Sequence, residues 1–190
     1  ATSGFCPHFF YGIDKIRLTG GEPLVRKDAA EIILALSELP VKLTLTTNGT
    51  RLHEFIDVLQ QARIQSLNIS LDTLQPDTFM LLTRRNQFQT VMNNIQLLLD
   101  KNFHVKLNVV VMRGINEKEI LDFVAWTKDS PIHVRFIEFM PFDGNHWKSD
   151  KVITMAEMLE VIGKLYEYTR LSHEKHDTAK KFQVPGHAGT

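Results

Sequence analysis

The stretch KIRLTGGEPLVRKD, Lys15–Asp28, alternates polar and apolar residues at its start and then breaks into two glycines, an acid and a proline. A period of two is typical of a β-strand with one buried face. The pattern recurs as KLTLT at Lys42–Thr46 and as SLNIS at Ser66–Ser70. Val105–Val111 and Val134–Phe139 are rich in Val, Ile, Leu and Phe, so the sequence predicts five strands.

Segments with helical spacing of apolar residues separate these strands. DAAEIILALSEL begins at Asp28, which we expect to be an N-cap, with Glu31 completing a capping box. RLHEFIDVLQQA, FQTVMNNIQLLLDK, EKEILDFVAWTK and TMAEMLEVIGKLYEY show the same periodicity. Strands that are joined by single helices indicate βαβ units and a parallel sheet. The predicted fold class is therefore α/β, either an open doubly wound sheet or a barrel.

The polar residues of the predicted strands share one face. Parallel strands that helices cover on both sides are normally apolar throughout. Here one face carries only polar side chains in the first three strands: Lys15, Arg17, Lys42, Thr44, Thr46, Ser66, Asn68 and Ser70. An antiparallel sheet with a wet face, or a covering domain, would also explain this pattern. The intervening helices disfavour the first, and we favour a wide or incomplete barrel around a large polar ligand.

The amino-acid composition excludes only a few classes of function. The chain has 190 residues, and its 22 Lys and Arg balance 22 Asp and Glu. We therefore expect neither nucleic acid nor a membrane surface as a partner. The single cysteine, Cys6, excludes a disulfide within the chain. No apolar run approaches the roughly 18 residues of a membrane-spanning helix.

The carboxyl ends of the strands are where α/β proteins bind ligands. Those ends here are TGGEP, TTNGT, SLDT, VVMRG and EFMPFDGN. The pair Gly20-Gly21 would let the backbone approach a ligand closely, although a Gly-Gly pair taken alone more often only shapes a tight turn. The cations Arg17, Lys106 and Arg135 on nearby strands predict a polyphosphate site. Ordinary ion pairing with an acid such as Glu138 is the alternative.

Five blocks together resemble one known family. KIRLTGGEPLVRKD, LTTNGT, LNISLDTL, KLNVVVMRGINEKEI and VRFIEFMPFDGN are similar to the GTP 3',8-cyclase family, also called molybdenum cofactor biosynthesis protein A, of the radical S-adenosylmethionine (SAM) superfamily. The resemblance runs from about Asp14 to Thr190. It implies a partial, open (β/α)6 barrel at 14–171, truncated at both ends. Residues 1–13 are then an irregular N-terminal segment, and 172–190 a polar loop leading to a C-terminal cluster module.

The resemblance also implies two sets of ligand-binding residues. The set for SAM is Gly21 and Glu22 at the methionine end, Ser70, and Met140 near the adenine. The set for GTP is Arg17, Thr46 and Lys106, with Lys15 and Arg135 as further phosphate partners.

The chemistry that the resemblance implies needs iron–sulfur clusters. The family holds two 4Fe-4S clusters, each on three cysteines, and one of them cleaves SAM reductively. The resulting radical converts GTP to (8S)-3',8-cyclo-7,8-dihydroguanosine 5'-triphosphate, the first step of molybdenum cofactor biosynthesis. Clusters require thiolates, and Cys6 stands alone. We therefore expect the cluster cysteines to lie outside this chain, and the chain alone to hold no metal, to contain no catalytic residue and to be inactive.

Two other interpretations stay open. The same face without clusters would make a non-catalytic module that binds SAM, nucleotide or a partner protein. An unrelated enzyme would act on a phosphorylated metabolite by Schiff-base chemistry, with Lys106 as nucleophile. The partners expected from the resemblance are GTP and SAM, and a homodimer is considered as the assembly. RFIEFMPFDGN followed by Trp147 favours a eukaryotic member and hence the mitochondrial matrix, with the cytoplasm as the bacterial alternative.

Overall fold

The computed structural model describes residues 12–140, 149–172 and 179–190. Its centre is a parallel sheet of five strands in the order β1-β2-β3-β4-β5. The strands are β1 Lys15–Leu18, β2 Lys42–Thr47, β3 Ser66–Ser70, β4 His104–Val111 and β5 His133–Glu138. Each strand bound differs from the predicted one by no more than one residue, and the α/β class is confirmed.

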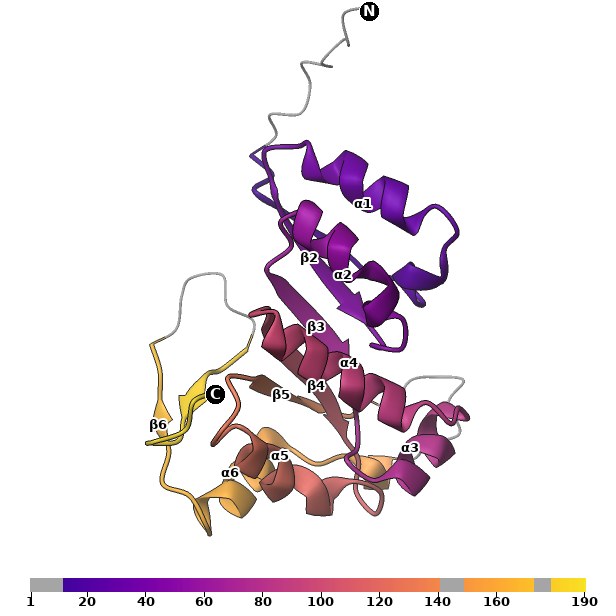
Figure 1. The fold of residues 1–190 in the computed structure, drawn as a ribbon. Coiled ribbons are helices and arrows are strands. Elements are labelled where there is room, and N and C mark those ends of the chain that lie inside the picture. Colours follow the sequence, from indigo (N-terminus) through magenta and orange to yellow (C-terminus); the bar gives the residue numbers. More distant parts are fainter. Residues whose placement is uncertain (1–11, 141–148, 173–178) are drawn as a thin grey trace, which may run out of the picture.

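The strand order follows the chain order without a reversal. A doubly wound sheet has a reversal point where its helices change sides, so the sheet winds in one direction instead, as a barrel does. Right-handed crossovers then place the connecting helices on one face, and Figure 1 shows them gathered there. The described residues form an open sheet with β1 and β5 at its two edges.

The helices that cover this face agree with the predicted segments. They are α1 Ala29–Ser37, α2 Leu52–Gln61, α4 Phe88–Asp100, α5 Ile120–Trp126 and α6 Met155–Gly163. The helix α3, Pro76–Thr83, was not predicted; its signal in the sequence is a proline in the first helical turn. Short 3-10 turns occupy Pro23–Val25, Glu117–Glu119 and Ser149–Lys151.

The capping box predicted for α1 is wrong. Asp28 is the N-cap residue, but its side chain makes no capping hydrogen bond. Its carboxylate instead accepts hydrogen bonds from the Arg26 guanidinium, at 2.5 and 2.9 Å. A charged donor two residues away therefore outcompetes the backbone amides of the first turn. A complete capping box forms at α6, between Thr154 and Glu157.

The register confirms that the strands have one polar and one apolar face. Leu45 is aligned with Leu67, which is aligned with Val105, and all three side chains are fully buried. On the alternate positions Thr46 is aligned with Asn68, which is aligned with Lys106. Paired residues of parallel strands point to the same side. The apolar side chains pack beneath the helices in one core.

The described chain returns to the sheet near its end. Two residues of 172–190 form β7, Phe182–Gln183, which pairs antiparallel with β6, Thr169–Arg170. The Thr190 amide then donates to the Ile132 carbonyl at 3.2 Å, and the Val134 amide donates to the Thr190 carbonyl at 2.8 Å. This alternation is that of a parallel ladder, so Thr190 lies along the outer edge of β5.

Candidate functional site

The turn after β1, at the carboxyl edge of the sheet, has open space around its two glycines. Gly20 has φ of +135°, a backbone conformation that side-chain-bearing residues rarely adopt. A Cβ atom added at Gly20 or Gly21 would meet no other atom within 4 Å. Packing within the described protein therefore does not require a glycine at Gly21. An exposed backbone beside free space fits the close approach of a ligand.

Glu22 joins this turn to the exit of β2. One carboxylate oxygen accepts hydrogen bonds from the Leu24 amide at 3.0 Å and from the Thr47 hydroxyl at 2.8 Å. The other accepts from the Asn48 amide at 2.6 Å. These bonds fix the two strand exits relative to each other, so Glu22 positions the glycine turn. Its predicted contact with SAM stays a prediction.

The polar face carries a band of cations. Lys15 is aligned with Lys42 across β1 and β2, and Arg135 lies on β5 beside the strand that bears Lys106. Burial lowers the pKa of Lys106, and the positive charges of Arg135, Lys15, Lys42 and Lys181 lower it further. Such a shift reports a positive potential at a half-buried site. A bound anion with several negative charges would offset this positive potential.

Ion pairing with protein acids does not explain these cations. Within residues 12–140, 149–172 and 179–190, no salt bridge involves Arg17, Lys106 or Arg135. Glu138, the alternative partner, is aligned with Val111 on the apolar side of the sheet. Its carboxylate accepts a hydrogen bond from the Met155 amide at 2.6 Å. The ion-pair alternative therefore fails for Glu138.

The remaining predicted residues lie on the same face or at its carboxyl edge. Thr46 accepts a hydrogen bond from the Asn68 amide group at 3.3 Å. Ser70 ends β3 with an exposed side chain and is aligned with Asn108. Met140 follows β5 and is 74% exposed. The structure thus gathers the predicted GTP residues and Ser70 on one face, while Gly21, Glu22 and Met140 lie at the strand exits. Which ligand each residue binds stays a prediction.

Sequence reasoning missed a polar network beneath the exits of β3 and β4. Asp72 accepts a hydrogen bond from the Val110 amide at 2.8 Å, and burial raises the pKa of its carboxyl. The Asn116 amide group donates to the carbonyls of Asp72 at 2.6 Å and Val110 at 2.8 Å. These bonds hold the two loops side by side.

Glu119 completes this network from the other side. It is 6% exposed, and its carboxylate accepts hydrogen bonds from the Thr73 hydroxyl at 2.7 Å and from the Leu74 amide at 2.6 Å. The signal in the sequence was the polar segment INEKE at 115–119, in the loop that follows β4. Two of its polar residues, Asn116 and Glu119, prove to be buried.

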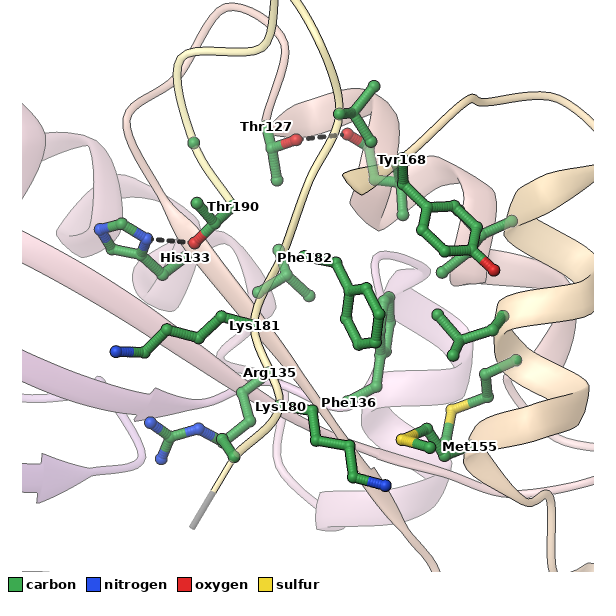
Figure 2. Close-up of a pocket in the computed structure, with 18 of the residues that line it drawn as sticks. Thr127, His133, Arg135, Phe136, Met155, Tyr168, Lys180, Lys181, Phe182 and Thr190 are labelled. Carbon is green, nitrogen blue, oxygen red and sulfur yellow. Dashed lines mark hydrogen bonds between the residues drawn. The ribbon is translucent and has the colours of Figure 1, made fainter. Parts of the chain in front are cut away.

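A cavity of about 610 Å³ lies along the outer edge of β5. Figure 2 shows Arg135 and Lys181 extending on one side of it, with Phe136, Met155 and Phe182 gathered on the other. Because Arg135 also belongs to the polar face, the cavity continues that face around the edge of the sheet. Its apolar half adjoins the core beneath α6.

The described residues offer no metal centre. They contain no group of three His, Cys, Asp or Glu side chains that could hold a metal ion. Cys6 lies outside the described residues. None of the helices in the described ranges is both long and apolar enough to span a membrane.

Comparisons with known proteins point the same way as the motifs. The sequence model of the radical SAM superfamily matches residues 8–127. The chain is 48% identical over 183 residues to "GTP 3',8-cyclase, mitochondrial" of Arabidopsis thaliana, covering 94% of this chain and 47% of that protein. It is 46% identical over 182 residues to "Molybdenum cofactor biosynthesis protein 1" of Homo sapiens, covering 94% of this chain and 29% of that protein. The chain thus spans less than half the length of these two relatives.

Solved structures show the same fold at low sequence identity. TYW1 with a lysine-pyruvate adduct bound superposes with a TM-score of 0.64 at 17% identity, over 90% of this chain and 56% of that one. At such identity the likeness concerns the fold alone.

Proposed function

Because the chain belongs to the radical SAM superfamily, we propose that it is the SAM- and nucleotide-binding barrel of a GTP 3',8-cyclase that acts in molybdenum cofactor biosynthesis. The observation that supports this best is the cationic polar face. Arg17, Lys106 and Arg135 form no described ion pair and lie on one side of the sheet. Guanidinium and ammonium groups in such an array suit a triphosphate. The names of the relatives supply the nucleotide.

We divide the face between two ligands. The strand-borne residues are assigned to GTP: Lys15, Arg17, Thr46, Lys106 and Arg135. The residues near the carboxyl edge are assigned to SAM: Gly21, Glu22, Ser70 and Met140. Charge supports this division, because four of the five strand-borne residues are cations and none of the residues near the carboxyl edge is. The open turn at Gly20-Gly21 leaves room for the backbone contacts of an amino-acid group.

SAM fits the open turn, but a 4Fe-4S cluster does not fit this chain. A cluster held by three cysteines requires three thiolates, and the 190 residues include one cysteine. We therefore propose that the chain by itself holds no cluster and is inactive, and that its residues bind and orient the two ligands. Iron and labile-sulfide analysis after anaerobic reconstitution tests this. Stoichiometric iron and sulfide on the 190-residue chain would contradict it.

The single cysteine also favours a second candidate, a module that binds SAM, nucleotide or a partner protein without cluster chemistry. The coding sequence on either side of this segment separates the two. A C-x3-C-x2-C motif upstream together with a further cysteine triplet downstream supports the cyclase. Their absence from the coding sequence supports the module.

Replacing Arg17 tests the division of the face. Arg17→Ala removes a charged donor from the proposed phosphate site, so GTP affinity should fall by about 10-fold or more. SAM affinity should stay within about twofold, because no Arg17 contact with SAM is proposed. Isothermal titration calorimetry measures both, with the exposed Lys101→Ala variant as the control. An equal loss for both ligands would refute the division.

Location and assembly stay proposals as well. The Arabidopsis relative is named as mitochondrial, and we propose the mitochondrial matrix for this chain if its source is eukaryotic. Import of the tagged precursor into isolated mitochondria tests this location. A homodimer is the proposed assembly, and sedimentation equilibrium decides between dimer and monomer.

A further inference from the structure

Lys106 differs from exposed lysines such as Lys101 because it is half-buried in the middle of the sheet. It lies on β4, aligned with Asn68 on β3 and with His133 on β5. No salt bridge among the described residues includes it. Its charge is therefore not offset by a carboxylate of the described protein, and the ammonium form is disfavoured at this position.

The surroundings of Lys106 favour the neutral amine. Burial lowers the pKa of Lys106, and the positive charges of Arg135, Lys15, Lys42 and Lys181 lower it further. Only the neutral amine has the lone pair that a nucleophile needs. A lysine that is desolvated or lies beside other cations is activated in this way, as in enzymes that form Schiff bases. The amine of Lys106 is thus more nucleophilic at neutral pH than that of an ordinary exposed lysine.

A small molecule can reach this amine, and the neighbouring cations select its charge. Lys106 lines the cavity of about 610 Å³ at the outer edge of β5, together with Arg135 and Lys181. Figure 2 shows Arg135 and Lys181 extending on the same side of that cavity. Guanidinium and ammonium groups bind phosphate oxygens. A molecule with both a phosphate and a carbonyl group would therefore be held by its phosphate while its carbonyl lies beside Lys106.

We propose that Lys106 is a site of covalent modification, where its amine forms an imine with small phosphorylated aldehydes. The neutral Nζ attacks the carbonyl carbon, and a C–N bond forms. The carbonyl oxygen then leaves as water with the two protons that Nζ carried, and a C=N bond remains. The reaction needs no oxidant or reductant, and it requires neither SAM nor GTP, so it goes beyond the proposed function. Because the aldehyde's phosphate would occupy cations assigned to GTP, the two ligands should exclude each other.

Chemical trapping with pyridoxal 5'-phosphate tests the proposal on the full 190-residue chain. Reduction with borohydride converts the imine to a stable secondary amine, and peptide mass spectrometry locates it. Lys106 should be labelled before exposed lysines such as Lys101. Pyridoxal, which has the same aldehyde but no phosphate, should label Lys106 about 10-fold less at equal concentration. That is the loss expected when charge-assisted hydrogen bonds to the phosphate are removed.

A conservative variant provides the matched comparison. Lys106→Arg keeps the positive charge, but its guanidinium stays protonated and forms no imine, so the rapidly labelled site should be lost. Lys101→Arg, at an exposed position, should be labelled at Lys106 as fast as the wild type. The urea midpoint checks that Lys106→Arg is folded. Peptide mapping of the wild type uses no variant, so it decides the proposal even if Lys106→Arg unfolds.

The outcomes separate this inference from the proposed function. Labelling of Lys106 that is no faster than labelling of Lys101, or equal labelling by pyridoxal and its phosphate, would overturn the inference. A chain that binds no GTP but is labelled at Lys106 would defeat the proposed function and leave the inference standing. GTP binding without labelling would do the reverse. If GTP binds, it should slow the labelling of Lys106, and an unchanged rate would overturn the inference because the phosphate would lie elsewhere.

Discussion

The two faces of the central sheet are built from alternate residues of the same strands, and they differ in burial and in charge. On one face Leu45, Leu67 and Leu107 are completely buried beneath the helices. On the other, Ser70 is exposed and Lys106 is half-buried among like charges. Burial of apolar side chains on the first face stabilises the folded protein, whereas the unpaired charges on the second face lower its stability. Residues that stabilise the core and residues that we propose for ligand binding therefore alternate along each strand.

The apolar face should be the more sensitive of the two. Leu67→Ala should lower the free energy of unfolding by about 2–5 kcal/mol, because it leaves a cavity in the centre of the core. Ser70→Ala, on the polar face of the same strand, should change it by no more than about 0.5 kcal/mol. Urea unfolding at pH 7 measures both. Similar costs for the two variants would break the comparison between the faces.

The buried network at the strand exits should rank second. Glu119→Gln keeps the size of the side chain but replaces a charged acceptor that serves both Thr73 and Leu74. We expect a loss of about 1.5–3 kcal/mol in the free energy of unfolding, the range for hydrogen bonds to charged groups. Asp122→Asn, an exposed change on α5, is the control. Faster amide exchange at Leu74 in the variant would locate the effect, and unchanged exchange there would contradict it.

The polar face should show the smallest effect, with the opposite sign. Lys106→Met removes a half-buried charge that the free protein disfavours, so it should raise the free energy of unfolding by less than about 1 kcal/mol. The folded-state pKa of Lys106 lies below its usual 10.5, so the unfolded chain holds the proton more tightly. The wild type therefore gains stability as pH rises from the folded pKa towards 10.5.

The advantage of Lys106→Met should accordingly be largest at neutral pH and shrink above the folded-state pKa of Lys106. Chemical denaturation of both proteins at several pH values measures this. Lys101→Met, at an exposed position, should show no such dependence. A variant that is less stable than the wild type at pH 7 would mean that Lys106 has a favourable partner on this face.

Much of the fold was predictable because short-range rules govern it. The alternation in KIRLT, KLTLT and SLNIS predicted three strands and their faces, and the register confirms both. α3 was missed because its eight residues, PDTFMLLT, are too few for a periodic pattern to stand out. The capping box at Asp28 was wrong because Arg26 competes for the same carboxylate. Competition of this kind depends on side-chain positions that a pattern does not contain.

The sequence by itself determined that one polar face exists and which residues line it, because a strand turns alternate side chains to opposite sides whatever surrounds it. It also determined that one cysteine cannot hold a cluster. Only the tertiary structure decided which polar groups are paired. Glu22 and Glu119 proved to accept hydrogen bonds from backbone amides, whereas Oδ1 of Asn108 is buried and has no donor among the residues that the structure describes. Pairing depends on distances between strands and loops that are far apart in the chain, and folding alone sets those distances.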